Sequence, residues 1–164
     1  ASLPGGSGPP GRASRRSRRQ ASRAEPRGAM GEELLLRAAQ RGDVEQAVLL
    51  LDRGKAAAQT RLPPVGTTPL HAASRAGNVD MVELLLRGRA DPNVCQVPAC
   101  GGKAPLHLAA QQDCPGVVLA LLQAGASPLL GDARGQTPLH VAAQEGRAAA
   151  ARLLLAHGAD PHLR

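Results

Sequence analysis

The stretch Thr137-Pro138-Leu139-His140 decides the fold, because the same pattern occurs twice more in the chain. Residues 68–71 repeat it unchanged, and residues 104–107 repeat it with alanine in place of the threonine. The copies start at positions 68, 104 and 137, so they are 36 and 33 residues apart. Such a spacing indicates an array of structural repeats, in which stacked units bury a face that one unit cannot bury alone.

The residues around each copy predict two short helices joined by a tight turn. Thr68 is expected to cap the first helix, and Pro69 suits its first turn, where the missing N–H needs no partner. After Gly77, Asn78 is expected to cap a second helix whose apolar residues recur at helical spacing. The last unit repeats this order, and a first unit without the motif starts near Glu32.

The third unit departs from its neighbours at three positions. Ala104 lacks a capping hydroxyl, Asp113 stands where the other units have glycine, and Cys114 replaces the cap provided elsewhere by Asp43 and Asn78. If that turn needs a positive φ, aspartate tolerates it less well than glycine. The sequence therefore predicts that the third unit is the weakest, and that Ala104→Thr with Asp113→Gly stabilises the array.

Composition limits the class of protein. The chain of 164 residues contains no Phe, Tyr or Trp, so its core must be built from Leu, Ala and Val in closely packed helices. No run approaches 18 apolar residues, which predicts that no helix spans a membrane. No phosphate-binding glycine loop, paired-carboxylate motif or Ser/His/Asp signature is present. We therefore predict neither enzyme activity nor a cofactor in this segment.

Residues 1–30 are predicted to be a disordered tail, because they are rich in Gly, Pro, Ser and Arg. Residues 1–29 carry seven arginines and one glutamate, a net charge of +6, whereas residues 30–164 carry +1. Three interpretations of the tail stay open: a nuclear-import signal, a contact with nucleic acid or membrane, or a solvated leader without a partner. We expect no nucleic-acid binding by the repeats.

The motif, its period and the glycine turns resemble those of the ankyrin-repeat family over residues 31–164. The resemblance implies an all-α solenoid of four helix-turn-helix units with projecting loops or β-hairpins, here called fingers. The units would span about residues 31–62, 63–99, 100–132 and 133–164, and the fingers residues 55–67, 89–103 and 126–136. The implied function is a non-catalytic scaffold or adaptor that binds another protein through its concave helix face and fingers.

Family positions carried onto this chain give candidate partner-binding residues. On the helices they are Arg37, Gln40, Arg41, Arg75, Gln111, Gln112, Gln144 and Glu145. In the fingers they are Arg61, Val94, Gln96, Asp132 and Arg134. The arginines at the N-terminal end favour a partner with an acidic segment. The alternative for each residue is a solvated surface with no partner.

Three histidines, His71, His107 and His140, recur at one position in each motif. Equivalent positions in stacked helices lie about 10 Å apart, which is too far for one shared metal ion. The resemblance implies a structural, hydrogen-bonding role for them.

The chain has three cysteines, Cys95, Cys100 and Cys114. A zinc site, with His107 or Asp91 as fourth ligand, a redox-active pair and ordinary loop cysteines stay open as interpretations. An odd number without a framework favours a reducing compartment, cytoplasmic and/or nuclear.

Two further functions are compatible with the sequence. One is a nuclear regulatory adaptor whose basic tail contacts nucleic acid or the import machinery. The other is the recognition segment of a longer protein with its activity elsewhere, or a kinase-inhibitor-like protein of four repeats. The last alternative follows from residues 38–45, which resemble the first repeat of the four-repeat inhibitors of cyclin-dependent kinases. We expect the chain to be monomeric.

Overall fold

The computed structural model describes residues 27–52, 58 and 66–162. Within these residues there are eight α-helices and one short 3-10 helix, and no extended strand. Four helix pairs follow one another: α1 (Arg27–Arg41) with α2 (Val44–Asp52), α3 (Pro69–Ala76) with α4 (Val79–Arg87), α5 (Pro105–Gln112) with α6 (Pro115–Gln123), and α7 (Pro138–Gln144) with α8 (Ala148–Ala156). The all-α solenoid of four units is confirmed.

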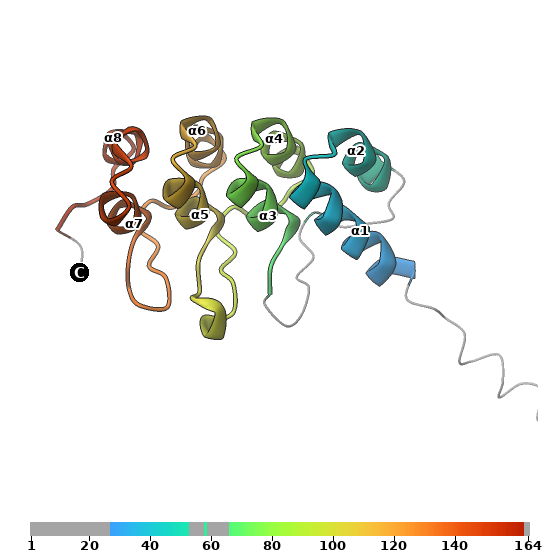
Figure 1. Ribbon diagram of the computed structural model, residues 1–164, viewed down its shortest axis with the longest axis horizontal. Helices are drawn as coiled ribbons and strands as arrows, with labels where there is room; N and C mark the ends of the chain where they lie inside the picture. The colour runs from blue at the N-terminus through green and yellow to red at the C-terminus, as the bar shows by residue number, and fades with distance from the viewer. Residues whose placement is uncertain (1–26, 53–57, 59–65, 163–164) are drawn as a thin grey trace, which may run out of the picture.

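The helices form two rows, and the fingers extend from one of them (Figure 1). The first helices α1, α3, α5 and α7 pack in sequence, and the second helices α2, α4, α6 and α8 form the other row. The described fingers are loops rather than β-hairpins, and one of them contains the 3-10 helix η1 (Pro98–Cys100). Two backbone hydrogen bonds cross that loop, from Gln96 N to Lys103 O at 3.0 Å and from Gly102 N to Val97 O at 3.3 Å.

Each helix pair begins and turns as its sequence predicts. Thr68 caps α3, where its hydroxyl accepts a hydrogen bond from the His71 backbone amide, and Pro69 occupies the first turn. Asn78 caps α4 by accepting a hydrogen bond from Met81 N at 3.0 Å. The Asp43 carboxylate does the same for α2 through Gln46 N at 3.1 Å.

The core is a continuous apolar layer between the two rows. It consists of alanines that let the helices approach closely and of larger side chains, mostly leucines, from both rows. Leu85, Leu121 and Leu154 occupy equivalent places in α4, α6 and α8, and each is fully buried. The absence of aromatic residues is therefore compensated by close packing of small side chains.

Two turn glycines are required by the neighbouring repeat as well as by their own backbone. Gly42 and Gly77 adopt φ values of +75° and +72°, which favour glycine. A Cβ at Gly42 would lie 2.7 Å from Nδ2 of Asn78, and a Cβ at Gly77 would lie 2.6 Å from Sγ of Cys114. The side chains at the cap positions of α4 and α6 thus pack against the turn of the preceding repeat.

The third repeat has the local defects that its sequence predicts. Asp113 adopts the left-handed conformation with φ +53°, and neither Ala104 nor Cys114 provides a side-chain cap. The same aspartate, however, accepts a hydrogen bond from Ala150 N of α8 at 3.2 Å. Because the residue before α8, Arg147, provides no side-chain cap of its own, Asp113 caps a helix of the next repeat.

The N-terminal boundary differs from the one predicted. Helix α1 begins at Arg27, four residues before the expected start of the repeats at residue 31. Residues 27–30 lack the apolar period on which the prediction depended, so their sequence did not indicate a helix. The other part of the predicted tail, residues 1–26, lies outside the described residues.

Candidate partner-binding face

The recurring histidines fix the fingers against the first helices. Nδ1 of His71 accepts a hydrogen bond from the Thr68 amide at 3.2 Å, so its Nε2 carries the proton and donates to Lys103 O at 3.1 Å. Nε2 of His107 donates to Gln136 O at 2.9 Å in the same way. Each of these histidines therefore connects its own helix to the base of the next finger.

Burial lowers the pKa of one of these side chains, His107. Desolvation lowers the pKa of His107 below the ordinary value of 6.5, and nearby Lys103 lowers it further. The hydrogen bond to the Gln136 carbonyl and the charge of Asp132 oppose this shift in part. His107 is therefore held in the neutral form that its hydrogen bonds require.

The base of each finger is also tied to the helix that follows it. Nζ of Lys103 donates to Oε1 of Gln111 at 3.2 Å, and Nε2 of Gln136 donates to Oε1 of Gln144 at 3.5 Å. Both pairs are eight residues apart and occupy equivalent positions in the third and fourth repeats. A row of polar side chains thus follows the inner face, which we define as the surface formed by the first helices and the fingers.

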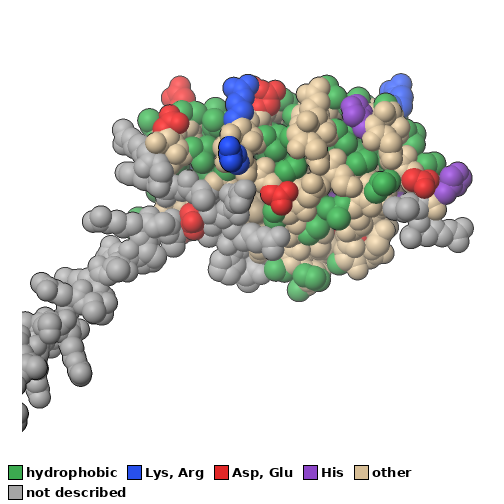
Figure 2. All heavy atoms as spheres, turned by 180° about the vertical axis from the view of Figure 1, so that it is seen from behind, with side chains coloured by type: hydrophobic (Ala, Val, Ile, Leu, Met, Phe, Trp, Pro, Cys, Tyr) green, Lys and Arg blue, Asp and Glu red, His purple; other side chains and the backbone are tan. Residues whose placement is uncertain are grey.

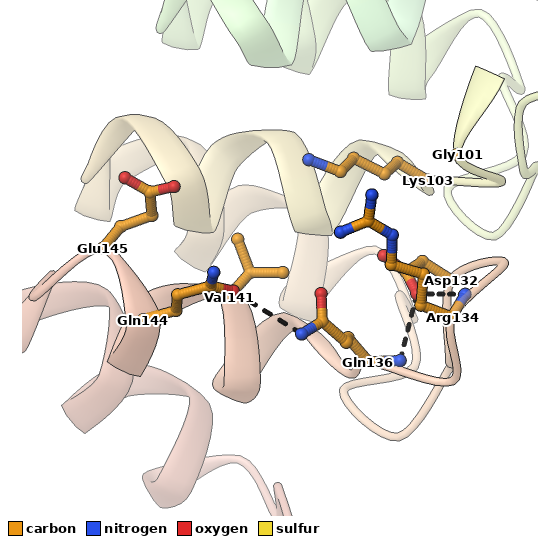
Figure 3. Close-up of a pocket in the computed structure, with 8 residues that line it drawn as sticks. All are labelled: Gly101, Lys103, Asp132, Arg134, Gln136, Val141, Gln144 and Glu145. Carbon is orange, nitrogen blue, oxygen red and sulfur yellow. Dashed lines mark hydrogen bonds between the residues drawn. The ribbon is translucent and has the colours of Figure 1, made fainter.

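A pocket of about 220 Å³ lies on this inner face where the third and fourth repeats meet (Figure 3). It is lined by Gly101 and Lys103 of one finger, by Asp132, Arg134 and Gln136 of the next, and by Val141, Gln144 and Glu145 at α7. Pockets that hold small molecules usually measure about 300–1,000 Å³. This pocket is smaller, and its size suits one side chain of another molecule.

Charges of opposite sign face this pocket from its two sides. Figure 3 shows the cationic ends of Lys103 and Arg134 next to one another on one side, and the carboxylate of Glu145 on the other. Oδ1 of Asp132 accepts hydrogen bonds from Arg134 N at 2.8 Å and from Gln136 N at 3.0 Å. This carboxylate therefore shapes its own finger and is turned toward the backbone.

Comparison with known proteins assigns the family. A model of ankyrin repeats (3 copies) matches residues 35–132 and again residues 89–164, so the matches together cover more than half of the chain. The chain belongs to the ankyrin-repeat family. Ankyrin repeats are a general protein–protein interaction module and are generally non-catalytic, which agrees with a binding face built from helices and loops.

Two curated relatives contain similar ankyrin segments. The chain is 48% identical over 59 residues to the 2-5A-dependent ribonuclease of Mus musculus, which covers 36% of this chain and 8% of that protein. It is 34% identical over 93 residues to the Ankyrin repeat and SOCS box protein 3 of Bos taurus, which covers 56% of this chain and 17% of that protein. The chain therefore matches only a small part of either relative.

Four of the predicted partner-binding residues meet at one place in this ankyrin array. Asp132, Arg134, Gln144 and Glu145 all line the pocket, although they come from a finger and from the end of α7. Gln111 adjoins it through its hydrogen bond to Lys103. The family positions therefore selected four residues that lie around one pocket in the structure.

The other predicted residues lie apart from the pocket. Gln40, Arg41, Arg75 and Gln112 are exposed on the first-helix row, and Val94 is half-buried in its finger. The Arg37 guanidinium forms an exposed ion pair with Glu33 at 2.7 Å, one helical turn away. Arg61 lies outside the described residues.

One predicted contact residue has a different role. Gln96 is only 5% exposed, and its Nε2 donates a hydrogen bond to Oγ1 of Thr67 at 3.2 Å. A buried amide must find hydrogen-bond partners within the protein, and here they are in the preceding repeat. Gln96 therefore holds two fingers together, and its side chain is buried rather than exposed on the surface.

Four pocket residues were missed from the sequence, and Gly101 is one of them. Lys103 and Gln136 immediately precede the motif, and Val141 lies inside α7, where it was expected to serve only the core. A signal for Lys103 and Gln136 was present, because positions 103 and 136 both directly precede the repeated four-residue motif and lie eight residues before a glutamine. This spacing indicates that the same arrangement of finger base and helix recurs in the third and fourth repeats.

The cysteines do not form a common site with the histidine named as a zinc ligand. Both ring nitrogens of His107 are occupied, by Ala104 N at 3.2 Å and by Gln136 O. Cys95 and Cys114 are half-buried, and Cys100 is exposed. Among the described residues, no group of three His, Cys, Asp or Glu side chains is arranged to hold a metal ion.

The charges outside the pocket give no broad field on the face seen from behind. Figure 2 shows acidic and basic side chains scattered singly over that face, among apolar and neutral polar atoms. In the part of the chain that the structure describes, no helix has the length and apolar character needed to cross a membrane.

Proposed function

We propose that this chain is a non-catalytic adaptor whose ankyrin repeats bind a segment of a partner protein along the inner face. The observation that carries the proposal is the pocket between the third and fourth repeats. Its walls come from two fingers and α7, and histidine bonds fix these two fingers to α3 and α5. Such a preformed surface binds with little loss of conformational entropy.

The proposal includes the cellular location and the oligomeric state of the chain. We place it in the cytoplasm and/or the nucleus as a monomer, since the three cysteines follow no disulfide framework. A second candidate function, a tail-dependent contact with nucleic acid or import machinery, is supported by the net charge of +6 in residues 1–29. Tail binding would weaken steeply with salt, because it releases counterions.

A displayed peptide library tests the inner face directly. The full chain selects binders from random dodecapeptides, and the dissociation constants of the best peptides are then measured for two matched variants. Gln144→Arg places a bulky side chain at the pocket, whereas Gln123→Arg makes the same change on the exposed end of α6. We expect Gln144→Arg alone to weaken binding.

Equal affinities for both variants, or a selection without any specific peptide, would exclude the inner face as the binding surface. Circular dichroism of both variants shows whether the array is intact. A binding constant that depends on residues 1–29 and falls steeply with salt would favour the tail-dependent function.

A further inference from the structure

The pocket contains two cations that form no ion pair within the described part of the chain. The Lys103 ammonium donates to a neutral amide, Gln111, and retains two further N–H donors. The Arg134 guanidinium forms no ion pair or hydrogen bond with any other residue in the described ranges. Both groups point to the same side of the pocket (Figure 3). They therefore offer unused donors to an anionic group.

The two carboxylates at the pocket do not fill this place. Asp132 directs Oδ1 to two backbone amides of its own finger, at 2.8 Å and 3.0 Å. Glu145 lies across the pocket from the cations and is exposed to solvent (Figure 3). A visiting anion is thus attracted at one side, and a second anion beside it would be repelled by Glu145.

The apolar floor and the volume of the pocket further restrict which group can bind there. Val141 supplies an apolar floor, which suits the methylene groups of a side chain. The volume of about 220 Å³ accepts one side chain, and a longer ligand must continue along the inner face outside the pocket.

We infer that the pocket binds one acidic side chain, glutamate or aspartate, of a partner protein, with its carboxylate between Lys103 and Arg134. This inference rests on the proposed function and names the chemistry of the partner at that site. It moves the acid-binding site from the N-terminal arginines, which the sequence favours, to the junction of the third and fourth repeats.

The experiment uses peptides selected on the full chain and synthetic versions in which each acidic residue is replaced by its amide. Two double variants remove the same net charge. Lys103→Gln with Arg134→Gln changes the pocket, and Arg87→Gln with Arg152→Gln changes exposed positions on α4 and α8. A single-stranded oligonucleotide serves as a second anionic probe, and thermal melting shows that each variant is folded.

We expect one acidic residue to be common to the selected peptides, and its amide version to bind about tenfold more weakly. The pocket variant should bind the acidic peptides as weakly as their amide versions, so that it no longer distinguishes acid from amide. The surface variant should behave like the parent chain.

Peptides that bind at the inner face without an acidic residue, or equal losses for both double variants, would overturn the inference while leaving the proposed function intact. Binding of the oligonucleotide, but of no peptide, through Lys103 and Arg134 would overturn it in favour of a phosphate site. Failure of the Gln144→Arg test would remove the proposed function itself.

Discussion

The second and third repeats solve the same structural problem in different ways. The second repeat caps its own helices with Thr68 and Asn78 and turns between them at a glycine. The third lacks these devices, yet Asp113 caps a helix of the fourth repeat through Ala150 N. Gln111 O of the same turn accepts a hydrogen bond from Nε of Arg147 at 3.1 Å. Bonds missing within one unit are thus made to the next.

This difference shows where the stability of a stacked array resides. A residue that is unfavourable in its own turn can be favourable at the interface, so a unit judged weak in isolation can hold its neighbour. The following predictions separate the two contributions, and they are ordered from the largest expected effect to the smallest.

The core should not distinguish the two repeats. Leu85→Ala and Leu121→Ala each remove a fully buried side chain from a second helix, and each should cost about 2–5 kcal/mol of unfolding free energy. Denaturant titration measures both, with Leu49→Ala as a control, because Leu49 is 53% exposed. Losses as small as that of the control would mean that the proposed core between the rows is wrong.

The stability of the fourth repeat should depend on Asp113 in the turn of the third repeat. Asp113→Ala removes the acceptor for Ala150 N and leaves a positive φ without glycine, so it should cost about 1–2 kcal/mol. Asp113→Asn keeps an acceptor and should stay near the parent.

The same contact changes the sequence-based expectation for glycine at this position. Asp113→Gly relieves the backbone but loses the cap, and these effects oppose each other. If Asp113→Gly raises the unfolding free energy by about 1 kcal/mol, as much as a helix cap contributes, the bond to Ala150 contributes nothing. Chemical denaturation of the three variants in parallel decides between these cases.

The missing hydroxyl of the third repeat should be replaceable. Oγ1 of Thr68 and Oγ1 of Thr137 each lie 2.8 Å from Nδ1 of their histidine, and Ala104 occupies the equivalent buried place. Ala104→Thr should therefore stabilise the array by about 0.5–1 kcal/mol. The reverse change, Thr68→Ala, should cost a similar amount in the second repeat. A lower melting temperature for Ala104→Thr would indicate that this site has no room for the larger side chain.

The smallest effect should be a dependence on pH in the third repeat. Burial lowers the folded-state pKa of His107 below 6.5, so the unfolded chain binds more protons than the folded one between the two pKa values. Its contribution is complete above pH 6.5 and is lost as the pH falls through the folded-state pKa. His107→Gln should reduce this slope, and NMR titration of the imidazole should give a pKa below 6.5. A pKa above 6.5 would contradict the assigned neutral state.

The sequence predicted most of the fold because the relevant signals are local. The motif, the caps at Asp43, Thr68 and Asn78, and the apolar spacing all act within about ten residues, and the structure confirms each of them. The early start of α1 at Arg27 was missed, since no periodic signal marks it.

The candidate site was predicted only in part because its contacts join different repeats. Family positions indicated Asp132, Arg134, Gln144 and Glu145, but not Lys103, whose place at the pocket depends on the neighbouring finger. The burial of Gln96 depends likewise on Thr67 of the preceding repeat. The spacing to a glutamine marks Lys103 as a repeated position, but its place at the pocket and the burial of Gln96 depend on how neighbouring repeats pack.

The turn glycines have a consequence for how such a chain changes over generations. The space at Gly42 is occupied by Asn78, and the space at Gly77 by Cys114, so each pair is one steric unit divided between two repeats. A larger residue at either glycine becomes tolerable only after its partner has become smaller and the backbone has relaxed. We therefore expect substitutions at positions 42 and 78, and at positions 77 and 114, to covary among related sequences. A single repeat copied elsewhere in the array would meet the wrong neighbour, even though its own motif remained complete.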